Sequence, residues 1–291
     1  MERVRQVLEV CPEEIVRAVM ALPQWEAVSI EEIRLRNGVH PSYLRNDRET
    51  PLCSMHINVA HLQVVIDRAS GSSVHSVQDM LKNGFVTISG GHRIGICGRG
   101  VYKDGELFSL RDISSLNLRV AREIRGIANS AVNFLWTHPR STLILAPPGR
   151  GKTTLLRDWI RQLSDRFRWR ICVVDERMEI AACIGARTQL LTGSFCDILS
   201  GVQKAQAIEM LLRSMNPQWI AVDEITAEKD VEAICQASYC GVRFLATAHA
   251  SSVEELHERP IYQKMINGKV FSNLILIDSG RNLQMGVLSN D

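Results

Sequence analysis

The sequence predicts an α/β protein in which a domain with a mostly parallel sheet follows a smaller α+β domain. From residue 128 onward, apolar strand patterns alternate with helical patterns, which favours a parallel sheet covered on both faces. Before Gly126 the order is irregular, with short strands and a hairpin turn. The 291 residues are enough for two domains. We therefore expect an N-terminal domain over residues 1–126 and a C-terminal domain over residues 127–291.

The N-terminal region combines short helices with short strands. Turn formers over 36–51 predict a loop with a short strand, and Lys103-Asp104-Gly105-Glu106 is typical of a hairpin turn. Helical patterns cover 13–20, 59–68 and 76–83. Strand patterns cover 30–35, 85–89, 93–98, 100–102 and 116–120. Together they predict an antiparallel sheet with helices beside it.

The C-terminal region repeats strand and helix. Strands are predicted over 142–145, 170–174, 219–222, 243–247 and 274–277. Helices are predicted over 152–163, 205–214 and 230–238. In an open parallel sheet ligands bind beyond the carboxyl ends of the strands, so the residues that follow each strand are the candidates for function.

Composition excludes several classes of protein. Hydrophobic residues make up 45% and charged residues 23%, which is typical of a folded chain and not of a disordered one. The net charge of +2 gives no bulk attraction to nucleic acid or to an anionic membrane. No apolar stretch approaches the ~20 residues of a membrane-spanning helix, and the N-terminus lacks an apolar signal core. The eight cysteines contain no C-x-x-C pair, so we expect reduced, mostly buried thiols. We therefore expect a cytosolic protein that can dock on a membrane complex.

Residues 146–154 have the pattern of a phosphate-binding loop between a strand and a helix. They read Ala-Pro-Pro-Gly-Arg-Gly-Lys-Thr-Thr, with Ala146 where such loops usually have their first glycine. Backbone N–H groups of such a loop cradle a phosphate, the lysine reaches the β- and γ-phosphates, and the hydroxyl after it holds Mg²⁺. The alternative is an ordinary strand–turn–helix. The predicted nucleotide-binding residues are Pro148, Gly149, Arg150, Gly151, Lys152, Thr153 and Thr154, with Thr153 also a metal ligand.

Acidic residues follow two further strands. Asp223 and Glu224 come directly after the strand over 219–222. We expect Asp223 to hold Mg²⁺, a hard cation that prefers oxygen ligands, and Glu224 to polarise the water that attacks the γ-phosphate. The alternative is that the pair caps the following helix, because acids also favour helix starts.

A second acidic cluster and a histidine complete the set of polar residues expected at the carboxyl ends of the strands. Asp175, Glu176 and Glu179 follow the strand over 170–174, where a carboxylate such as Glu176 can orient water or metal; the alternative is ion pairing to Arg177 or Arg187. His249 follows the strand over 243–247 and can sense the γ-phosphate through a ring N–H. A lone histidine is more often structural, but its place after a core strand favours function.

The order of these motifs resembles the secretion ATPases of type II and type IV systems, which are RecA-like hexameric motors. Met215-Asn216-Pro217 with 219–225, and Thr247-Ala248-His249-Ala250, are similar to their metal-binding and histidine motifs. The longer strings over 85–99, 111–122, 174–177 and 212–215 resemble the stage III sporulation protein AA family. That resemblance implies an ATP- and Mg²⁺-dependent ATPase in the cytoplasm of the mother cell. It would energise a secretion-like channel to the forespore, with membrane proteins of that channel as partners and a hexamer as its own assembly.

The resemblance also implies that an arginine of the N-terminal domain completes the nucleotide site, often across a subunit boundary. Arg99, Arg111, Arg119 and Arg122 are candidates by position. Arg119 is preferred because it lies on the polar face of an alternating strand, where a guanidinium can meet phosphate. Each of them can instead be a solvated surface charge.

Two other functions stay open at this point. RecA-like cores also occur in nucleic-acid motors, although the near-neutral charge and the lack of a basic–aromatic stripe argue against nucleic acid here. Ala146 and the short segment after His249 also allow a nucleotide-gated scaffold with little hydrolysis. The presence of Lys152, Thr153 and Glu224 favours ATP hydrolysis over a scaffold role.

Overall fold

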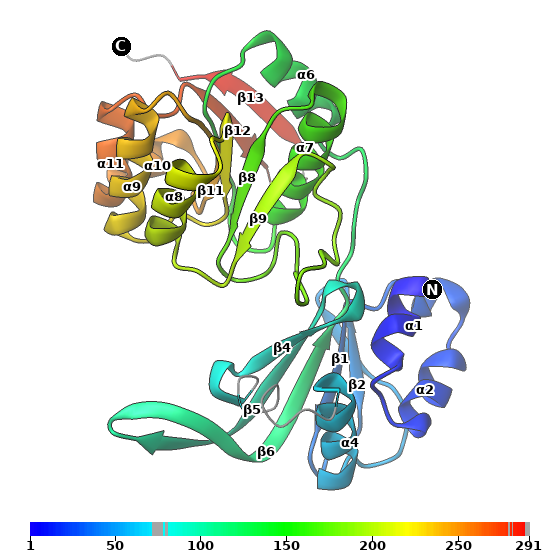
Figure 1. The fold of residues 1–291 in the computed structure, drawn as a ribbon. Coiled ribbons are helices and arrows are strands. Elements are labelled where there is room, and N and C mark those ends of the chain that lie inside the picture. The colour runs from blue at the N-terminus through cyan, green and yellow to red at the C-terminus, as the bar shows by residue number, and fades with distance from the viewer. Residues whose placement is uncertain (72–77, 79–80, 279, 281, 289–291) are drawn as a thin grey trace. The chain divides into compact units, whose positions relative to one another are not determined.

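A computed structural model describes residues 1–71, 78, 81–278, 280 and 282–288. The chain divides into two compact units, Met1–Arg122 and Glu123–Asp291 (Figure 1). Each unit has its own sheet and its own core. In the part of the chain that the structure describes, no helix is both long and apolar enough to cross a membrane.

The N-terminal unit is an antiparallel sheet with helices packed on it. Its strand order is β3-β2-β1-β6-β5-β4. The strands are β1 (Glu32–Arg36), β2 (Ser42–Arg45), β3 (Arg48–Pro51), β4 (Phe85–Ile88), β5 (His92–Lys103) and β6 (Glu106–Arg119). The helices are α1 (Glu2–Leu8), α2 (Glu13–Met20), α3 (Gln24–Ala27) and α4 (Val59–Ala69), and a single 3₁₀ turn, η1 (Ser89–Gly91), precedes β5. Apolar faces of α1, α2 and α4 share one core with β1, β5 and β6.

Several predicted N-terminal elements differ from the observed ones in extent. The strands predicted over 93–98 and 100–102 form one strand, β5, with a register shift between Cys97 and Arg99. Only the end of β6 was predicted, because its first half mixes apolar and polar residues without a regular alternation and is exposed or half-buried. The 36–51 segment holds two strands, β2 and β3, instead of one. The helix predicted over 76–83 includes residues 76, 77, 79 and 80, which lie outside the described residues.

The C-terminal unit confirms the mostly parallel sheet. Its order is β13-β12-β7-β11-β10-β8-β9, and every neighbouring pair is parallel except β12 with β13. The strands are β7 (Thr142–Leu145), β8 (Ile171–Asp175), β9 (Cys196–Ser200), β10 (Trp219–Val222), β11 (Arg243–Ala248), β12 (Asn273–Ile277) and β13 (Leu283–Val287). Because β11 lies between β7 and β10, its carboxyl end separates the phosphate-loop strand from the Asp223 strand.

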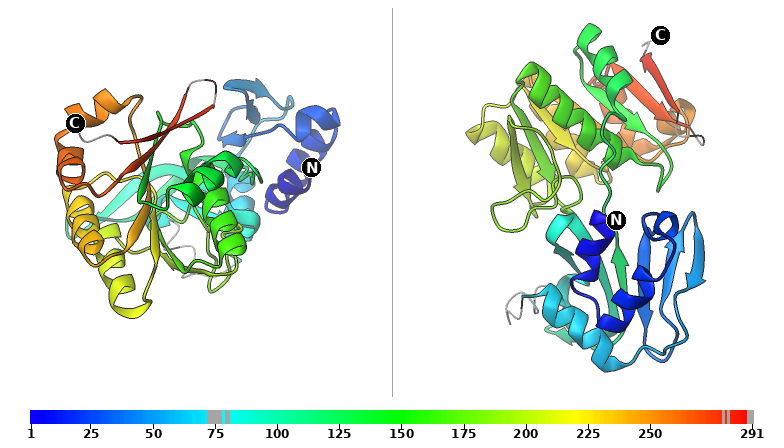
Figure 2. Two further views of the ribbon diagram at one scale, coloured as in Figure 1. Left: turned by 90° about the horizontal axis from the view of Figure 1, so that it is seen from above. Right: turned by 90° about the vertical axis from the view of Figure 1, so that its right-hand side faces the viewer.

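Two layers of helices cover the two faces of this sheet (Figure 2). One face packs against α6 (Asn129–Thr137) and α7 (Lys152–Phe167) through Ile144 and its neighbours. The other packs against α8 (Lys204–Ser214), α9 (Glu228–Tyr239), α10 (Val253–Glu258) and α11 (Pro260–Asn267) through Leu143 and Leu145. Successive strand residues point to opposite faces, so both must be apolar, which is why these strands read as continuous apolar runs.

The eight cysteines are all free thiols, but fewer are buried than the sequence analysis expects. Cys11, Cys172 and Cys235 are buried, Cys53, Cys183 and Cys196 are half-buried, and Cys97 and Cys240 are exposed. Burial raises the pKa of the Cys11 thiol to about 12 and that of Cys172 to about 11, which keeps both protonated.

Candidate active site

The loop between β7 and α7 has the geometry of an anion cradle. Gly149 and Gly151 have φ of +73° and +89°, a left-handed conformation that favours glycine, and a Cβ added to either would meet nothing within 4 Å. The loop therefore borders open space at the N-terminus of a 16-residue helix, where unpaired N–H groups attract anions. Ala146 is fully buried in the core beneath the loop, so its methyl group does not crowd the cradle.

Lys152 is the first residue of α7, directly after this loop, and connects the loop to His249. Its Nζ donates to the carbonyl oxygens of Ala146 and Pro147, at 2.9 and 3.0 Å, and lies 2.9 Å from Nδ1 of His249. Burial lowers the pKa of Lys152, and the charges of Glu224 and Asp223 act in the opposite direction. An ammonium group can only donate, so Nδ1 of His249 accepts and the neutral ring carries its proton on Nε2.

Asp223 accepts hydrogen bonds from two threonine hydroxyls. Thr153, in the first turn of α7, donates to one carboxylate oxygen at 2.6 Å, and Thr247 of β11 donates to the other at 2.5 Å. Burial raises the pKa of Asp223, while the two hydroxyls lower it. The adjacent oxygens of Thr153 and Asp223 fit Mg²⁺, which takes few protein ligands and keeps several waters. Among the described residues, no group of three or more His, Cys, Asp and Glu side chains could hold a metal ion.

Glu224 is held in position by three neighbours. Its φ is +52°, uncommon for a residue with a side chain, and its N–H donates to the hydroxyl of Thr247 at 2.8 Å. Nε2 of His249 donates to one carboxylate oxygen at 3.0 Å, and Arg177 forms an ion pair with the other. The carboxylate therefore faces the histidine that contacts Lys152.

The alternative role of the acid pair, capping the next helix, is wrong. Helix α9 begins at Glu228, after the N-cap residue Ala227, and the side chain of Asp230 accepts from the N–H of Ala227. Asp223 and Glu224 lie before this turn, and their side chains contact Thr153, Thr247, His249 and Arg177 instead.

The second acidic cluster separates into different roles. The buried carboxylate of Asp175 accepts four backbone N–H groups, from residues 179–182, at 2.8–3.3 Å, and so fixes the loop after β8. Glu176 forms an ion pair with Lys204, whose side chain is buried. Arg177 reaches Glu224 across the edge of the sheet. A small hollow is lined by residues of this loop together with Lys204, Asp223 and Glu224.

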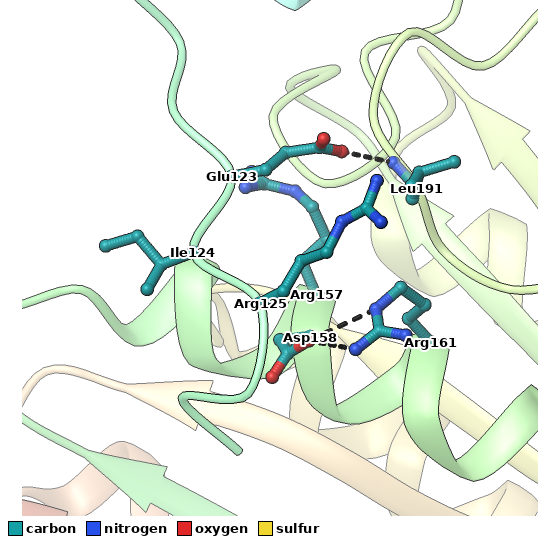
Figure 3. A pocket seen from close by; sticks show the side chains of 7 residues that line it. All are labelled: Glu123, Ile124, Arg125, Arg157, Asp158, Arg161 and Leu191. Carbon is teal, nitrogen blue, oxygen red and sulfur yellow. Dashed lines mark hydrogen bonds and ion pairs between the residues drawn. The ribbon is translucent and has the colours of Figure 1, made fainter. Parts of the chain in front are cut away.

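The same loop is bound to the start of the C-terminal unit, as Figure 3 shows. The carboxylate of Glu123 accepts the N–H of Leu191 at 2.6 Å. Asp158 of α7 accepts the N–H of Ala128 at 3.0 Å and forms an ion pair with Arg161. Glu123, Asp158, Arg161 and Leu191 are among the residues that line a second small hollow. These contacts attach the segment that enters the unit both to α7 and to the loop after β8.

Arg119 lies in β6 of the N-terminal unit. Its Nε is 3.3 Å from Glu32, and its side chain is 62% exposed. Arg99 pairs with Asp112 at 3.0 Å, and Arg122 donates to the carbonyl of Ile30 at 2.9 Å. The predicted role of Arg119 at a nucleotide stays a prediction.

Three residues at this edge were not singled out in the sequence analysis. Thr247 joins Asp223 to Glu224, and its place near the end of an apolar strand, two residues before His249, was an available signal. Buried Arg157 donates to the carbonyl oxygens of Glu179 and Ile180. Lys204 is 28 residues from its partner Glu176, so no local pattern connects them.

Comparisons with known proteins agree with this architecture. The family described as sporulation stage III, protein AA matches residues 1–286. Stage III sporulation protein AA of Bacillus subtilis is 34% identical over 276 residues, which cover 93% of this chain and 89% of that protein.

Solved structures share the fold at low sequence identity. The pilus retraction motor PilT with bound ADP has a TM-score of 0.65 at 19% identity, covering 96% of this chain and 82% of PilT. The ATPase DotB of Yersinia pseudotuberculosis has a TM-score of 0.62 at 15% identity, covering 95% of this chain and 79% of DotB. At such identities the likeness shows the fold alone, a PilT-like ATPase fold, whereas the family match spans nearly the whole sequence. The chain therefore belongs to the sporulation stage III protein AA family.

Proposed function

We propose that this chain is a Mg²⁺-dependent ATPase that works as a secretion-type motor for a sporulation channel. One observation carries the proposal. Hydrogen bonds connect Lys152 to Glu224 through His249, and Glu224 to Asp223 and Thr153 through Thr247. The groups come from the phosphate loop and from the ends of β10 and β11, so separate segments converge where a triphosphate would bind.

The phosphate loop would bind ATP through residues Pro148–Thr154. Backbone N–H groups at the start of α7 would bind the β-phosphate, and the Lys152 ammonium would exchange its loop carbonyls for phosphate oxygens. Thr153 and Asp223 would hold Mg²⁺, which neutralises charge on the β- and γ-phosphates when bound.

Glu224 would orient the water for hydrolysis. The water oxygen bonds to the γ-phosphorus while the bond from phosphorus to the β–γ bridging oxygen breaks, giving ADP and inorganic phosphate. Glu224 accepts the hydrogen bond of the water, His249 fixes the direction of the carboxylate, and Lys152 offsets charge on the leaving oxygen. Glu176 lines the same hollow as Glu224 and would help to order water near the Glu224 carboxylate.

The motor role rests on family membership together with the two-unit architecture. In this proposal Arg119 contacts the nucleotide of a neighbouring subunit in a hexamer, so that the nucleotide state biases the arrangement of the units. The protein would act in the cytoplasm of the mother cell, peripheral to a membrane complex whose proteins are its partners. No nucleic acid is expected, because the net charge is only +2.

Phosphate release measured against protein concentration, with sedimentation under the same conditions, tests this proposal. We expect specific activity to rise with ring formation, and Lys152→Ala to remove nucleotide binding or turnover. Lys229→Ala, an exposed lysine of α9, is the matched control. Nucleotide binding without turnover in any assembly would point to a scaffold, and strong stimulation by single-stranded DNA to a nucleic-acid motor.

A further inference from the structure

The carboxylate of Glu224 is engaged on both of its oxygens. His249 donates to one of them, and Arg177 forms an ion pair with the other. A carboxylate that orients an attacking water must offer an oxygen to that water, so the guanidinium of Arg177 competes with it. Each carboxylate oxygen can accept two hydrogen bonds, so the ion pair takes up acceptor capacity and draws negative charge from the oxygen that the hydrolytic step would use.

Arg177 has a fixed backbone and a side chain with room to move. It lies in the turn after β8, where the N–H of Met178 donates to the carbonyl of Asp175 at 3.1 Å and the Asp175 carboxylate binds the next four N–H groups. Its side chain is 53% exposed and lines the hollow that Asp223 and Glu224 also line. A long side chain on a fixed turn can change partners without a change in the loop.

We propose that Arg177 senses the terminal phosphate of ATP by exchanging Glu224 for that phosphate. The inference rests on the proposed ATPase function and adds the regulation of the same site. Without a γ-phosphate the guanidinium stays on Glu224. With ATP bound, it moves to the γ-phosphate and leaves one Glu224 oxygen for the attacking water.

The chain of contacts places Arg177 within reach of that phosphate. In the proposed function Lys152 and Glu224 would flank the γ-phosphate, and a single imidazole ring, that of His249, spans the distance between them. Arg177 already contacts Glu224, so only the Glu224 carboxylate separates its guanidinium from that position. The guanidinium presents a fork of donors that matches two phosphate oxygens, which makes the phosphate the stronger partner. ADP has no γ-phosphate, so it leaves the Arg177–Glu224 pair intact.

Nucleotide selectivity separates this role from a purely structural one. We would measure the dissociation constants of ADP and of a non-cleavable ATP analogue, with Mg²⁺, for wild type and Arg177→Ala. A lost charge-assisted hydrogen bond predicts analogue affinity weaker by roughly tenfold, with ADP affinity unchanged to within about twofold. Arg187→Ala, an exposed arginine of the same loop, is the control and should change neither constant. Equal changes in both constants, or no change in either, would overturn the inference.

A double-mutant cycle tests the exchange itself. Glu224→Gln removes the charge that holds Arg177, so it should tighten analogue binding in the wild-type background and do so less in the Arg177→Ala background. Equal effects in the two backgrounds would mean that the pair is not coupled to the phosphate. Arg177→Lys keeps the charge without the fork, and serves in the cycle if the alanine variant does not fold.

The two proposals can fail separately. If wild type binds neither nucleotide and Lys152→Ala changes nothing, the proposed ATPase function fails. If wild type binds both nucleotides and hydrolyses ATP, but Arg177→Ala keeps the same preference between them, only the role of Arg177 fails.

Discussion

At the residue scale, Glu224 combines an uncommon backbone conformation with a central position in the site. A left-handed φ on a residue with a Cβ costs on the order of 1–3 kcal/mol and persists only where neighbours hold it. The hydroxyl of Thr247 supplies that restraint through the Glu224 N–H. The fold therefore accepts local strain to direct this carboxylate.

Glu224→Gln should lower phosphate release at saturating ATP by roughly 100-fold or more, the usual contribution of a positioned acid–base group. Nucleotide binding should persist, because the phosphate loop is unchanged. Glu209→Gln, an acid on the exposed face of α8, is the control. Equal turnover by wild type and Glu224→Gln would assign the water-orienting role to another residue, with Glu176 the next candidate.

Thr247→Val should damage both stability and turnover. The substitution keeps the shape but leaves the Glu224 N–H and one Asp223 oxygen without their shared partner, at a cost of about 1–3 kcal/mol in the free energy of unfolding. Urea unfolding and phosphate release would be measured together. Thr247→Ser restores the hydroxyl and should recover turnover; a serine variant as inactive as the valine variant would argue that the methyl group matters instead.

At the element scale, the loop after β8 depends on one carboxylate. The carboxylate of Asp175 accepts four backbone N–H groups, and Asp175→Asn removes its charge and replaces one acceptor oxygen with an NH₂ donor. The loop should therefore lose about 2 kcal/mol of local stability. Hydrogen exchange at residues 179–182 should accelerate, with β10 and β11 unaffected. Asp197→Asn, an exposed acid of β9, is the control. Unchanged protection in Asp175→Asn would show that Arg157, which binds the carbonyls of this loop, is sufficient.

At the scale of the whole molecule, acid should destabilise the N-terminal unit through one buried histidine. Buried His92 accepts the N–H of Ala121 on Nδ1 and lies 3.1 Å from Gln6 on Nε2. Burial, with a smaller effect from the charge of Arg3, lowers the pKa of His92 from 6.5 to about 4. Between these values the unfolded chain binds more protons, so the free energy of unfolding falls by about 3 kcal/mol as pH falls through that window.

Thermal unfolding of wild type and His92→Gln between pH 4 and pH 7 checks this expectation. The variant should be less stable at pH 7 but should lose less stability on acidification. His257→Gln, an exposed histidine, should follow wild type. Parallel pH profiles for His92→Gln and wild type would assign the acid sensitivity to other groups.

Much of the fold around the candidate active site could be predicted from the sequence. Strands buried on both faces are continuous apolar runs, so β7, β8, β10 and β11 and the polar residues at their ends stand out. Edge strands such as β9 and β13 have one side toward solvent and lack that signal. The first half of β6 pairs with β5 alone and is mostly exposed.

Contacts between distant segments could not be predicted. Nothing near Glu176 indicates Lys204, and nothing near Glu224 indicates Arg177, because the sheet order that joins them is a property of the folded chain. The hydrogen-bond partners of Thr247 could not be predicted either. The sequence shows that this residue has a hydroxyl, but the placement of β11 beside β10 decides that the hydroxyl meets Asp223 and Glu224.

Two exposed cysteines offer a pair of sites for attaching fluorescent dyes. Cys97 on β5 and Cys240 after α9 are exposed, and each lies in a different unit. The buried thiols react slowly because they are inaccessible and stay protonated. Dyes that react with cysteine should therefore label one position in each half of the wild-type chain before the others. Energy transfer between those dyes would report whether nucleotide changes the separation of the halves, without engineered cysteines.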